Sequence, residues 1–292
     1  MSASLPSPID LPPSAPQVEF GRSSEDFPVA GIGDLVVAML PGQGGHFLAS
    51  AWRIQQPLSE LKRDDFTSRS ASIENEADFR ARVSVHAEHC DELRMLDRKT
   101  LRMPCHTPWG PSQGATIYAE GVVSHTTASH GGFKLSPERN RRVHRTLRVE
   151  DGWYEEDSAW SILAITFPDL FTSYERGCAE RTLKDRFPDA WETIFGTILA
   201  PGESHEKDRR AFDAAHGADW VVISAIRLDR HPGMTEVIAT LGGKRAFGIE
   251  ERRFLVPSDE YAVGRFGFVI DPDRHASYHG PSGFVGWSGR TA

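Results

Sequence analysis

Residues 115–135 read ATIYAEGVVSHTTASHGGFKL, and this stretch predicts a pair of neighbouring β-strands. Apolar and polar residues alternate along it, with Ile117, Val122 and Phe133 among the apolar positions. Such alternation is typical of half-buried strands, because successive side chains point to opposite faces of a sheet. The two histidines and the glycine pair in its second half add polar chemistry that a sheet by itself does not require.

Further strands are predicted on both sides of this pair. Residues 33–40, GDLVVAML, and 46–54, HFLASAWRI, flank the glycine-rich turn PGQGG and are typical of a hairpin. Near the C-terminus, apolar and β-branched runs are separated by Pro, Gly and Asp turns. These runs are WVVISAIRL (220–228), MTEVIATLGG (234–243), ERRFLVP (251–257) and EYAVGRFGFVI (260–270).

Two segments have helical periodicity. The first runs from Ile73 to about Asp97, with Ser72 as its expected N-cap. Its apolar stripe consists of Phe79, Val83, Ala87, Cys90 and Leu93. The second begins at Ser158 and continues, with breaks at prolines, to about residue 216. The sequence therefore predicts an α+β fold, in which one or more largely antiparallel sheets pack with a helical segment around residues 158–216.

Composition divides the chain into three predicted parts. Residues 1–25 are rich in Pro and Ser and cannot build a packed face, so we expect a disordered tail. Residues 26–103 contain the first hairpin and the first helix and form an N-terminal unit. Residues 104–292 form the main α+β domain.

The bulk composition predicts a cytoplasmic protein. Its formal net charge of −8 argues against a general coat for nucleic acid. Cys90, Cys105 and Cys178 are odd in number and lack CxxC spacing, which fits a reducing compartment. There is no signal-peptide pattern and no long apolar span, so we expect no contact with a membrane.

His130 is the first candidate catalytic residue. If residues 122–130 formed one strand, His125 and His130 would point to opposite faces, so we favour the histidine beside the glycines. Gly131 and Gly132 would let backbone N–H groups approach an anionic ligand closely. The structural alternative is a strand end that turns on the glycine pair beside a hydrogen-bonded histidine.

Glu155 and Asp157 are the candidate acidic partners of His130. With Glu156 they form a run of carboxylates in GWYEEDSAW (152–160), between aromatic residues that suggest partial burial. A carboxylate held in this way can serve as an acid, a base or a metal ligand. The alternative is that these acidic residues cap the helix that follows.

No metal site or cofactor is assigned from the sequence. Two histidines and a carboxylate can hold zinc or iron, but no HExxH or EF-hand spacing is present. The string HAEHC (86–90) lacks the PCxxC partner that a zinc deaminase requires, so that class is excluded.

A basic segment follows the glycine pair. Lys134, Arg139 and Arg142 are candidate anion-binding residues, since RNRRVHRTLR (139–148) is the strongest local positive charge in the chain. The alternatives are a solvated face paired with nearby acids, or a nucleic-acid-binding module formed by residues 134–148.

Four blocks resemble an uncharacterised domain family of proteins encoded by bacterial plasmids, integrated elements and phages. The blocks are AWRIQQPLSELKRDDF (51–66), CHTPWGPSQ (105–113), ASHGGFKLSPERN (128–140) and GWYEEDSAW (152–160), and the resemblance covers roughly residues 45–290. Related domains also occur in large polyvalent proteins of mobile elements, beside anti-restriction and DNA-processing modules. The resemblance implies an accessory role for a mobile element and gives no reaction.

Three hypotheses for function follow. The first is an accessory protein of a plasmid or phage that contacts host or element proteins, including nucleic-acid or defence machinery. The second is a hydrolase- or transferase-like enzyme on a nucleotide or another anionic small molecule, with His130 and an acidic partner at its centre. The third is weak nucleic-acid binding by the basic segment. The sequence leaves open whether the protein is an enzyme.

Overall fold

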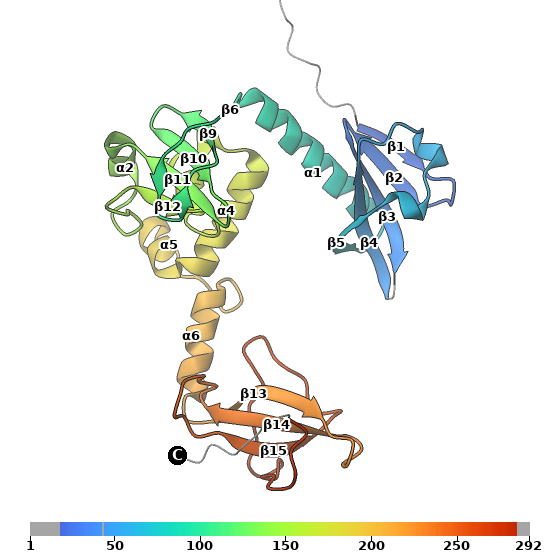
Figure 1. Cartoon of the computed structure of the whole chain (residues 1–292), viewed down its shortest axis with the longest axis vertical. Coiled ribbons are helices and arrows are strands. Elements are labelled where there is room, and N and C mark those ends of the chain that lie inside the picture. The colour runs from blue at the N-terminus through green and yellow to red at the C-terminus, as the bar shows by residue number, and fades with distance from the viewer. Residues whose placement is uncertain (1–17, 43, 285–292) are drawn as a thin grey trace, which may run out of the picture. The chain divides into compact units, whose positions relative to one another are not determined.

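The computed structural model describes residues 18–42 and 44–284 (Figure 1). The chain divides into two compact units, residues 1–183 and residues 184–292. Both contain helices and antiparallel sheets, so the predicted α+β class is confirmed. Within the described ranges, no helix is both long and apolar enough to cross a membrane.

The first unit begins with a sheet of five strands in chain order. They are β1 (Val18–Arg22), β2 (Pro28–Ile32), β3 (Leu35–Gly42), β4 (Gly45–Trp52) and β5 (Ser68–Ile73). The predicted hairpin is confirmed, since β3 pairs antiparallel with β4. Residues 1–17 of the expected tail lie outside the described residues. The sheet begins before residue 26, because Val18 and Phe20 of β1 pack against its apolar core.

Helix α1 (Glu76–Met95) covers one face of this sheet through the predicted stripe, of which Phe79, Val83 and Ala87 are buried. The opposite face packs against the connection from β4 to β5, which contains η1 (Leu58–Glu60) and η2 (Arg63–Asp65). The expected N-cap was wrong. Ser72 lies in β5, and the Asn75 side chain accepts the hydrogen bond from the Asp78 N–H at 3.0 Å. The small polar residues of β5 gave no strand pattern.

A second sheet of five strands forms the centre of the chain, in the order β12-β11-β10-β9-β6. Its strands are β6 (Lys99–Leu101), β9 (Gly114–Ala119), β10 (Val122–Thr126), β11 (Gly131–Leu135) and β12 (Trp153–Glu155). The expected pair of strands is thus the β9–β10–β11 meander. A small two-stranded ribbon, β7 (His106–Thr107) with β8 (Gly110–Pro111), precedes β9.

One face of the central sheet is apolar. Phe133 and Tyr154 lie opposite each other on β11 and β12, and Phe133 and Tyr118 contact the Phe171 ring. Phe171 follows α3 (Trp160–Thr166) and η3 (Pro168–Leu170) and precedes α4 (Ser173–Arg186). Helix α2 (Pro137–Arg142) follows β11. With this face occupied by the core, polar side chains of β10–β12 collect on the other face.

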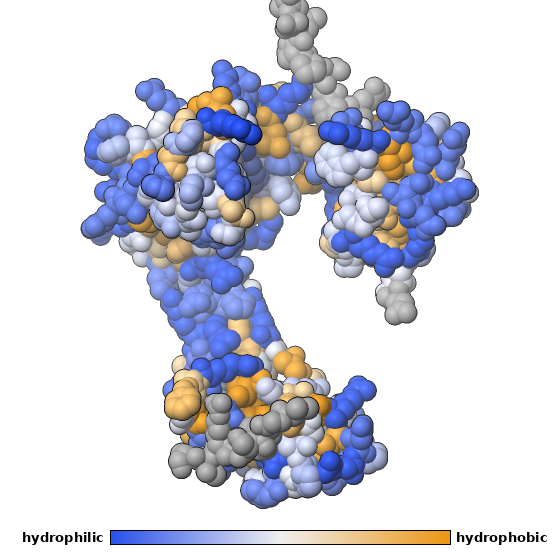
Figure 2. Space-filling view, in the orientation of Figure 1, coloured by the Kyte–Doolittle hydropathy of each residue, from blue (hydrophilic) through white to orange (hydrophobic). Residues whose placement is uncertain are grey.

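The second unit contains α5 (Pro188–Phe195), α6 (His205–His216) and a sheet of β13 (Trp220–Arg227), β14 (Met234–Leu241) and β15 (Arg252–Pro257). Figure 2 shows mostly hydrophilic residues on the visible face of α6, which carries the ion pairs Arg209–Asp213 and Arg210–Glu206. Residues 260–270, expected as a fourth strand, form isolated bridges instead. Gly267 has a φ of 140°, which interrupts regular strand geometry.

A buried carboxylate links β14 and β15 to the end of the described chain. The Glu236 side chain is 0% exposed and pairs with Arg253 at 2.9 Å. It also accepts hydrogen bonds from the Ser282 hydroxyl and from the Gly283 N–H, both at 2.7 Å. A buried charge is tolerated only when it is paired and hydrogen-bonded in this way.

Candidate functional site

His130 lies at the turn between β10 and β11. The Thr127 N–H donates to the His130 carbonyl at 2.8 Å, and the Thr127 hydroxyl accepts from the His130 N–H at 3.2 Å. The chain therefore reverses between the two histidines and does not continue as one strand. This corrects the premise that His125 and His130 occupy one extended segment.

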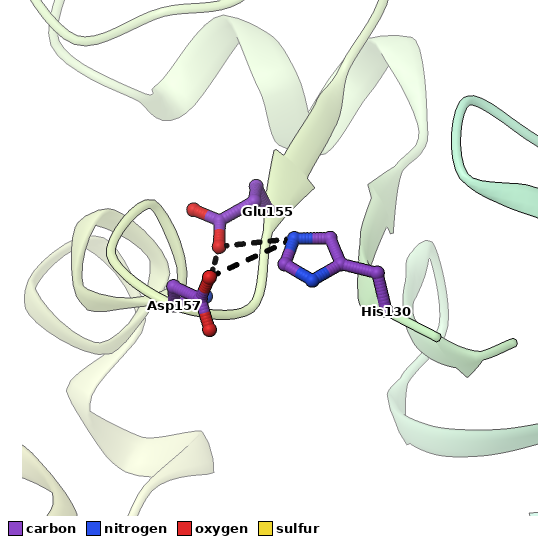
Figure 3. Close-up of side chains that lie close together, drawn as sticks. All are labelled: His130, Glu155 and Asp157. Carbon is purple, nitrogen blue, oxygen red and sulfur yellow. Dashed lines mark hydrogen bonds and ion pairs between the residues drawn. The ribbon is translucent and has the colours of Figure 1, made fainter. Parts of the chain in front are cut away.

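The His130 ring lies among the carboxylates of the acidic run, and Figure 3 shows those of Glu155 and Asp157 on its Nε2 side. Its Nε2 lies 3.3 Å from Glu155 Oε1 and 3.9 Å from Asp157 Oδ2, while its Nδ1 lies 3.5 Å from Glu156 Oε1. The side chains of His130 and Glu155 are 27% and 28% exposed, so both are partly buried but open to solvent. The structure thus brings the three predicted catalytic residues together. One ligand atom from each lies within 4.8 Å of the others.

Glu155 has two tasks. It is the last residue of β12, and its carboxylate accepts hydrogen bonds from the backbone of Asp157 and from Ser158, whose N–H lies at 3.1 Å. Burial alone would raise the pKa of Glu155, but these hydrogen bonds outweigh it and hold the pKa below its ordinary value. The carboxylate is therefore charged and fixed in position. The structural alternative, capping of the helix that follows, is not observed: α3 has no side-chain cap, and Glu155 holds the turn before it.

Gly131 and Gly132 make room for other side chains. Both belong to β11, where Gly132 pairs with His125 on one side and with Glu155 on the other. A Cβ at Gly131 would overlap the Glu156 carboxylate, and one at Gly132 would overlap the Trp109 ring. As residues of an interior strand, they lie in the sheet ladder and not in a loop that could wrap around an anion.

Trp109 covers Gly132 and joins the two histidines in one aromatic cluster. Its ring centroid lies 5.7 Å from that of His130 and 5.8 Å from that of Trp153. Trp153 in turn lies 5.5 Å from His125. The contact of Trp109 with a glycine in another strand has no local signal in the sequence.

His125 belongs to a different polar group on this face. It is 4% exposed, and burial lowers its pKa. Its Nδ1 lies 3.1 Å from the Ser112 hydroxyl and 3.5 Å from the Cys105 sulfur. A metal held by both histidines and a carboxylate, considered from the sequence, does not match this arrangement. Sequence analysis missed both Cys105 and Ser112.

The predicted anion-binding cations do not converge on His130. The Lys134 amine contacts the Asp151 carbonyl and lies 5.0 Å from the centre of the Trp153 ring. Arg139 donates to the Glu120 carbonyl at 3.0 Å, and Arg142 lies 4.8 Å from the centre of the Phe167 ring.

Arg139 is far from the His130 imidazole because the two lie at opposite ends of strand β10. Glu120 stands just before β10 and His130 just after the turn that follows β10. At about 3.3 Å per residue, roughly 15 Å of strand separates the two ends. Within the described residues, no lysine or arginine forms an ion pair with the acidic run around His130.

Comparison with known proteins identifies a domain but no activity. Residues 102–217 match the family model described as Domain of unknown function (DUF7007). The match confirms an uncharacterised domain in this part of the chain, which is shorter than the expected residues 45–290. All predicted site residues lie inside the match. Neither a search of curated proteins nor a search of solved structures found a match.

Proposed function

We propose that the domain at residues 102–217 is a metal-assisted hydrolase- or transferase-like enzyme. Its centre is formed by His130, Glu155 and Asp157. The observation that carries the proposal is the spacing of their ligand atoms. Charge-assisted hydrogen bonds to a carboxylate measure about 2.7–2.9 Å. The separations of 3.3 Å and 3.9 Å from Nε2 exceed this range.

These separations fit ligands of a shared metal ion better than they fit direct hydrogen bonds. Nitrogen and oxygen ligands lie about 2.1 Å from zinc, so two ligands of a tetrahedral site are roughly 3.4 Å apart. Imidazole and carboxylate donors suit zinc, manganese and iron. Nδ1 of His130 faces Glu156, and such a carboxylate on the second ring nitrogen orients many metal-binding histidines.

Charge supports the same proposal. Three carboxylates lie around one imidazole, and the candidate cation Lys134 contacts a backbone carbonyl instead. A divalent cation would balance this charge, and its chemistry would be the activation of water or the polarisation of a substrate oxygen. His130 and Glu155 would then serve as ligands and not as a proton-transfer pair. Because Arg139 and Arg142 lie elsewhere, the proposal does not extend to anionic substrates.

The first test is metal binding. We expect calorimetric titration with Zn²⁺ or Mn²⁺ to give one site per chain. His130→Ala and Glu155→Gln should each weaken it by at least the ~10–100-fold that loss of an outer partner costs in metal sites. The control is Glu138→Gln, since Glu138 is exposed and pairs with Arg141. A panel of uncharged ester and amide substrates should give turnover that a chelator removes.

Two results would contradict the proposal. The first is equal metal affinity in the wild type and in both site variants. The second is turnover that survives removal of metal and the His130→Ala substitution. Turnover that depends on His130 but not on metal would restore the proton-transfer hypothesis, with Glu155 as the orienting carboxylate.

For the cellular role we propose a cytoplasmic accessory protein of a bacterial plasmid or phage that contacts host or element proteins. This rests on the resemblance of four blocks to proteins of mobile elements. The match to an uncharacterised domain is compatible with it. Expression in a bacterial host should change plasmid establishment or phage plating. Unchanged frequencies at verified expression would count against it.

The nucleic-acid hypothesis for residues 134–148 has less to support it. Arg139 donates to the Glu120 carbonyl, and Arg148 donates to the carbonyl groups of Val143 and Arg141. These guanidinium groups hold the connection between β11 and β12. A steep salt dependence of DNA binding that flattens in Arg141→Ala would revive the hypothesis.

A further inference from the structure

Cys105 lies against a buried histidine. Its sulfur is 3.5 Å from Nδ1 and 4.0 Å from Nε2 of His125. Cys105 itself is partly exposed, whereas His125 is 4% exposed. A partly exposed cysteine with an imidazole beside it has the arrangement of a nucleophile and its base.

Ser112 decides which nitrogen of His125 can act as the base. Its hydroxyl donates its one hydrogen to the Gly114 carbonyl at 3.1 Å. In the tautomer that this hydrogen bond favours, the Ser112 oxygen accepts from His125 Nδ1, also 3.1 Å away. Nδ1 then carries the hydrogen and Nε2 carries the lone pair. The sulfur is nearer to Nδ1, but the hydrogen there is engaged by Ser112.

We propose that Cys105 is a reactive thiol that exchanges with small aromatic disulfides, with His125 as its base and Ser112 as the residue that positions the ring. Nε2 of His125 accepts the thiol proton while the Cys105 sulfur attacks one sulfur of the disulfide. The old S–S bond breaks as the new one forms. The leaving thiolate takes the proton from His125 and departs as a thiol.

The surroundings favour a small ligand with a ring. His125 contacts the Trp153 ring, and Trp153 contacts Trp109, so the histidine beside the thiol belongs to an aromatic cluster. Cys90 and Cys178, the other cysteines, lie on α1 and α4, and all three cysteines are free. The product is therefore a stable mixed disulfide on Cys105.

The test uses a chain in which Cys90→Ser and Cys178→Ser leave Cys105 as its single thiol. The second-order rate constant with 4,4′-dithiodipyridine is measured at pH 7, folded and in urea, and the adduct is identified by mass spectrometry. We expect the folded thiol to react at least about tenfold faster than the unfolded one. His125→Gln should remove this advantage, since a positioned base contributes on this scale or above. Glu138→Gln is the matched control.

Ser112→Ala keeps the base but removes the group that fixes its tautomer. We expect an intermediate rate, and a pH profile shifted relative to that of the parent chain. This variant also decides the matter if His125→Gln does not fold, which circular dichroism would reveal. Equal rates in the folded and unfolded chains, or rates unaffected by both substitutions, would overturn the proposal.

Discussion

Two carboxylates in this chain are held in similar ways and serve different ends. Glu236 and Glu155 each accept backbone N–H groups, from Gly283 and Ser158 respectively. For both, burial would raise the pKa, and hydrogen bonds lower it below the ordinary value. Glu236 is fully buried and has a guanidinium partner, whereas Glu155 is 28% exposed and its ionic neighbour is an imidazole.

The two sites therefore differ in their balance of charges. They do not differ in the direction in which the pKa of the glutamate is shifted. Around Glu236, one positive group from Arg253 matches one negative group. Around Glu155, two further carboxylates, those of Glu156 and Asp157, crowd the same ring. A balanced cluster needs nothing more, whereas an unbalanced one has a place for a cation.

The largest effect is expected when the Glu236–Arg253 ion pair is removed. Glu236→Ala removes the carboxylate that pairs with the partly buried Arg253 and should lower the free energy of unfolding by about 3–5 kcal/mol. Hydrogen exchange in β13–β15 measures it. Glu250→Ala is the control, because the exposed Glu250–Arg252 pair should contribute less than about 1 kcal/mol. Equal losses in both variants would remove the distinction between buried and exposed pairs.

The next effect concerns Gly132, which packs under Trp109 beside the cluster around Glu155. Gly132→Ala places a methyl group into the Trp109 ring and the Tyr154 carbonyl. We expect a loss of about 1–3 kcal/mol, as for other overpacked sites, together with weaker metal binding. Gly177→Ala in α4 is the matched control. The nearest atom to its new methyl group is 3.9 Å away, so it should be neutral or stabilising. Thermal unfolding distinguishes the two, and an unchanged Gly132→Ala would contradict the packing.

The smallest effect is a dependence on pH at Glu155, measured without metal. The folded state holds the pKa of Glu155 low, so its stabilisation is present above the unfolded pKa of about 4.3 and lost as pH falls through the folded pKa. The wild type should exceed Glu155→Gln by about 1 kcal/mol near pH 6. This advantage should disappear between about pH 5 and pH 3. A constant difference across that range would show that ionisation has no part in it.

Local patterns predicted the strands and helices well, because alternation and helical stripes report which side chains are buried. They found β3, β4, β10, β11 and α1, as well as the helical segment from residue 158 onward. They missed β5, whose residues are small and polar. They overestimated residues 260–270, where glycines interrupt the pairing.

The site was predictable only where its parts are close in sequence. The meeting of His130 with the acidic run was anticipated from their closeness in sequence, but strand β12, which carries Glu155, was not predicted. The positions of Arg139 and Arg142 were not, since the direction in which β11 leaves the turn carries them to its far end. The approach of Cys105 to His125 depends on the path of the chain through the β7–β8 ribbon, which has no periodic signal.

The indole of Trp109 gives this protein a natural optical reporter. It lies edge-on against His130, so we expect its emission to change when a metal binds that ring. The change is assigned to Trp109, among the seven tryptophans of the chain, by comparison with a variant that lacks it. Replacing Trp109 by phenylalanine would silence the signal while keeping a ring over Gly132.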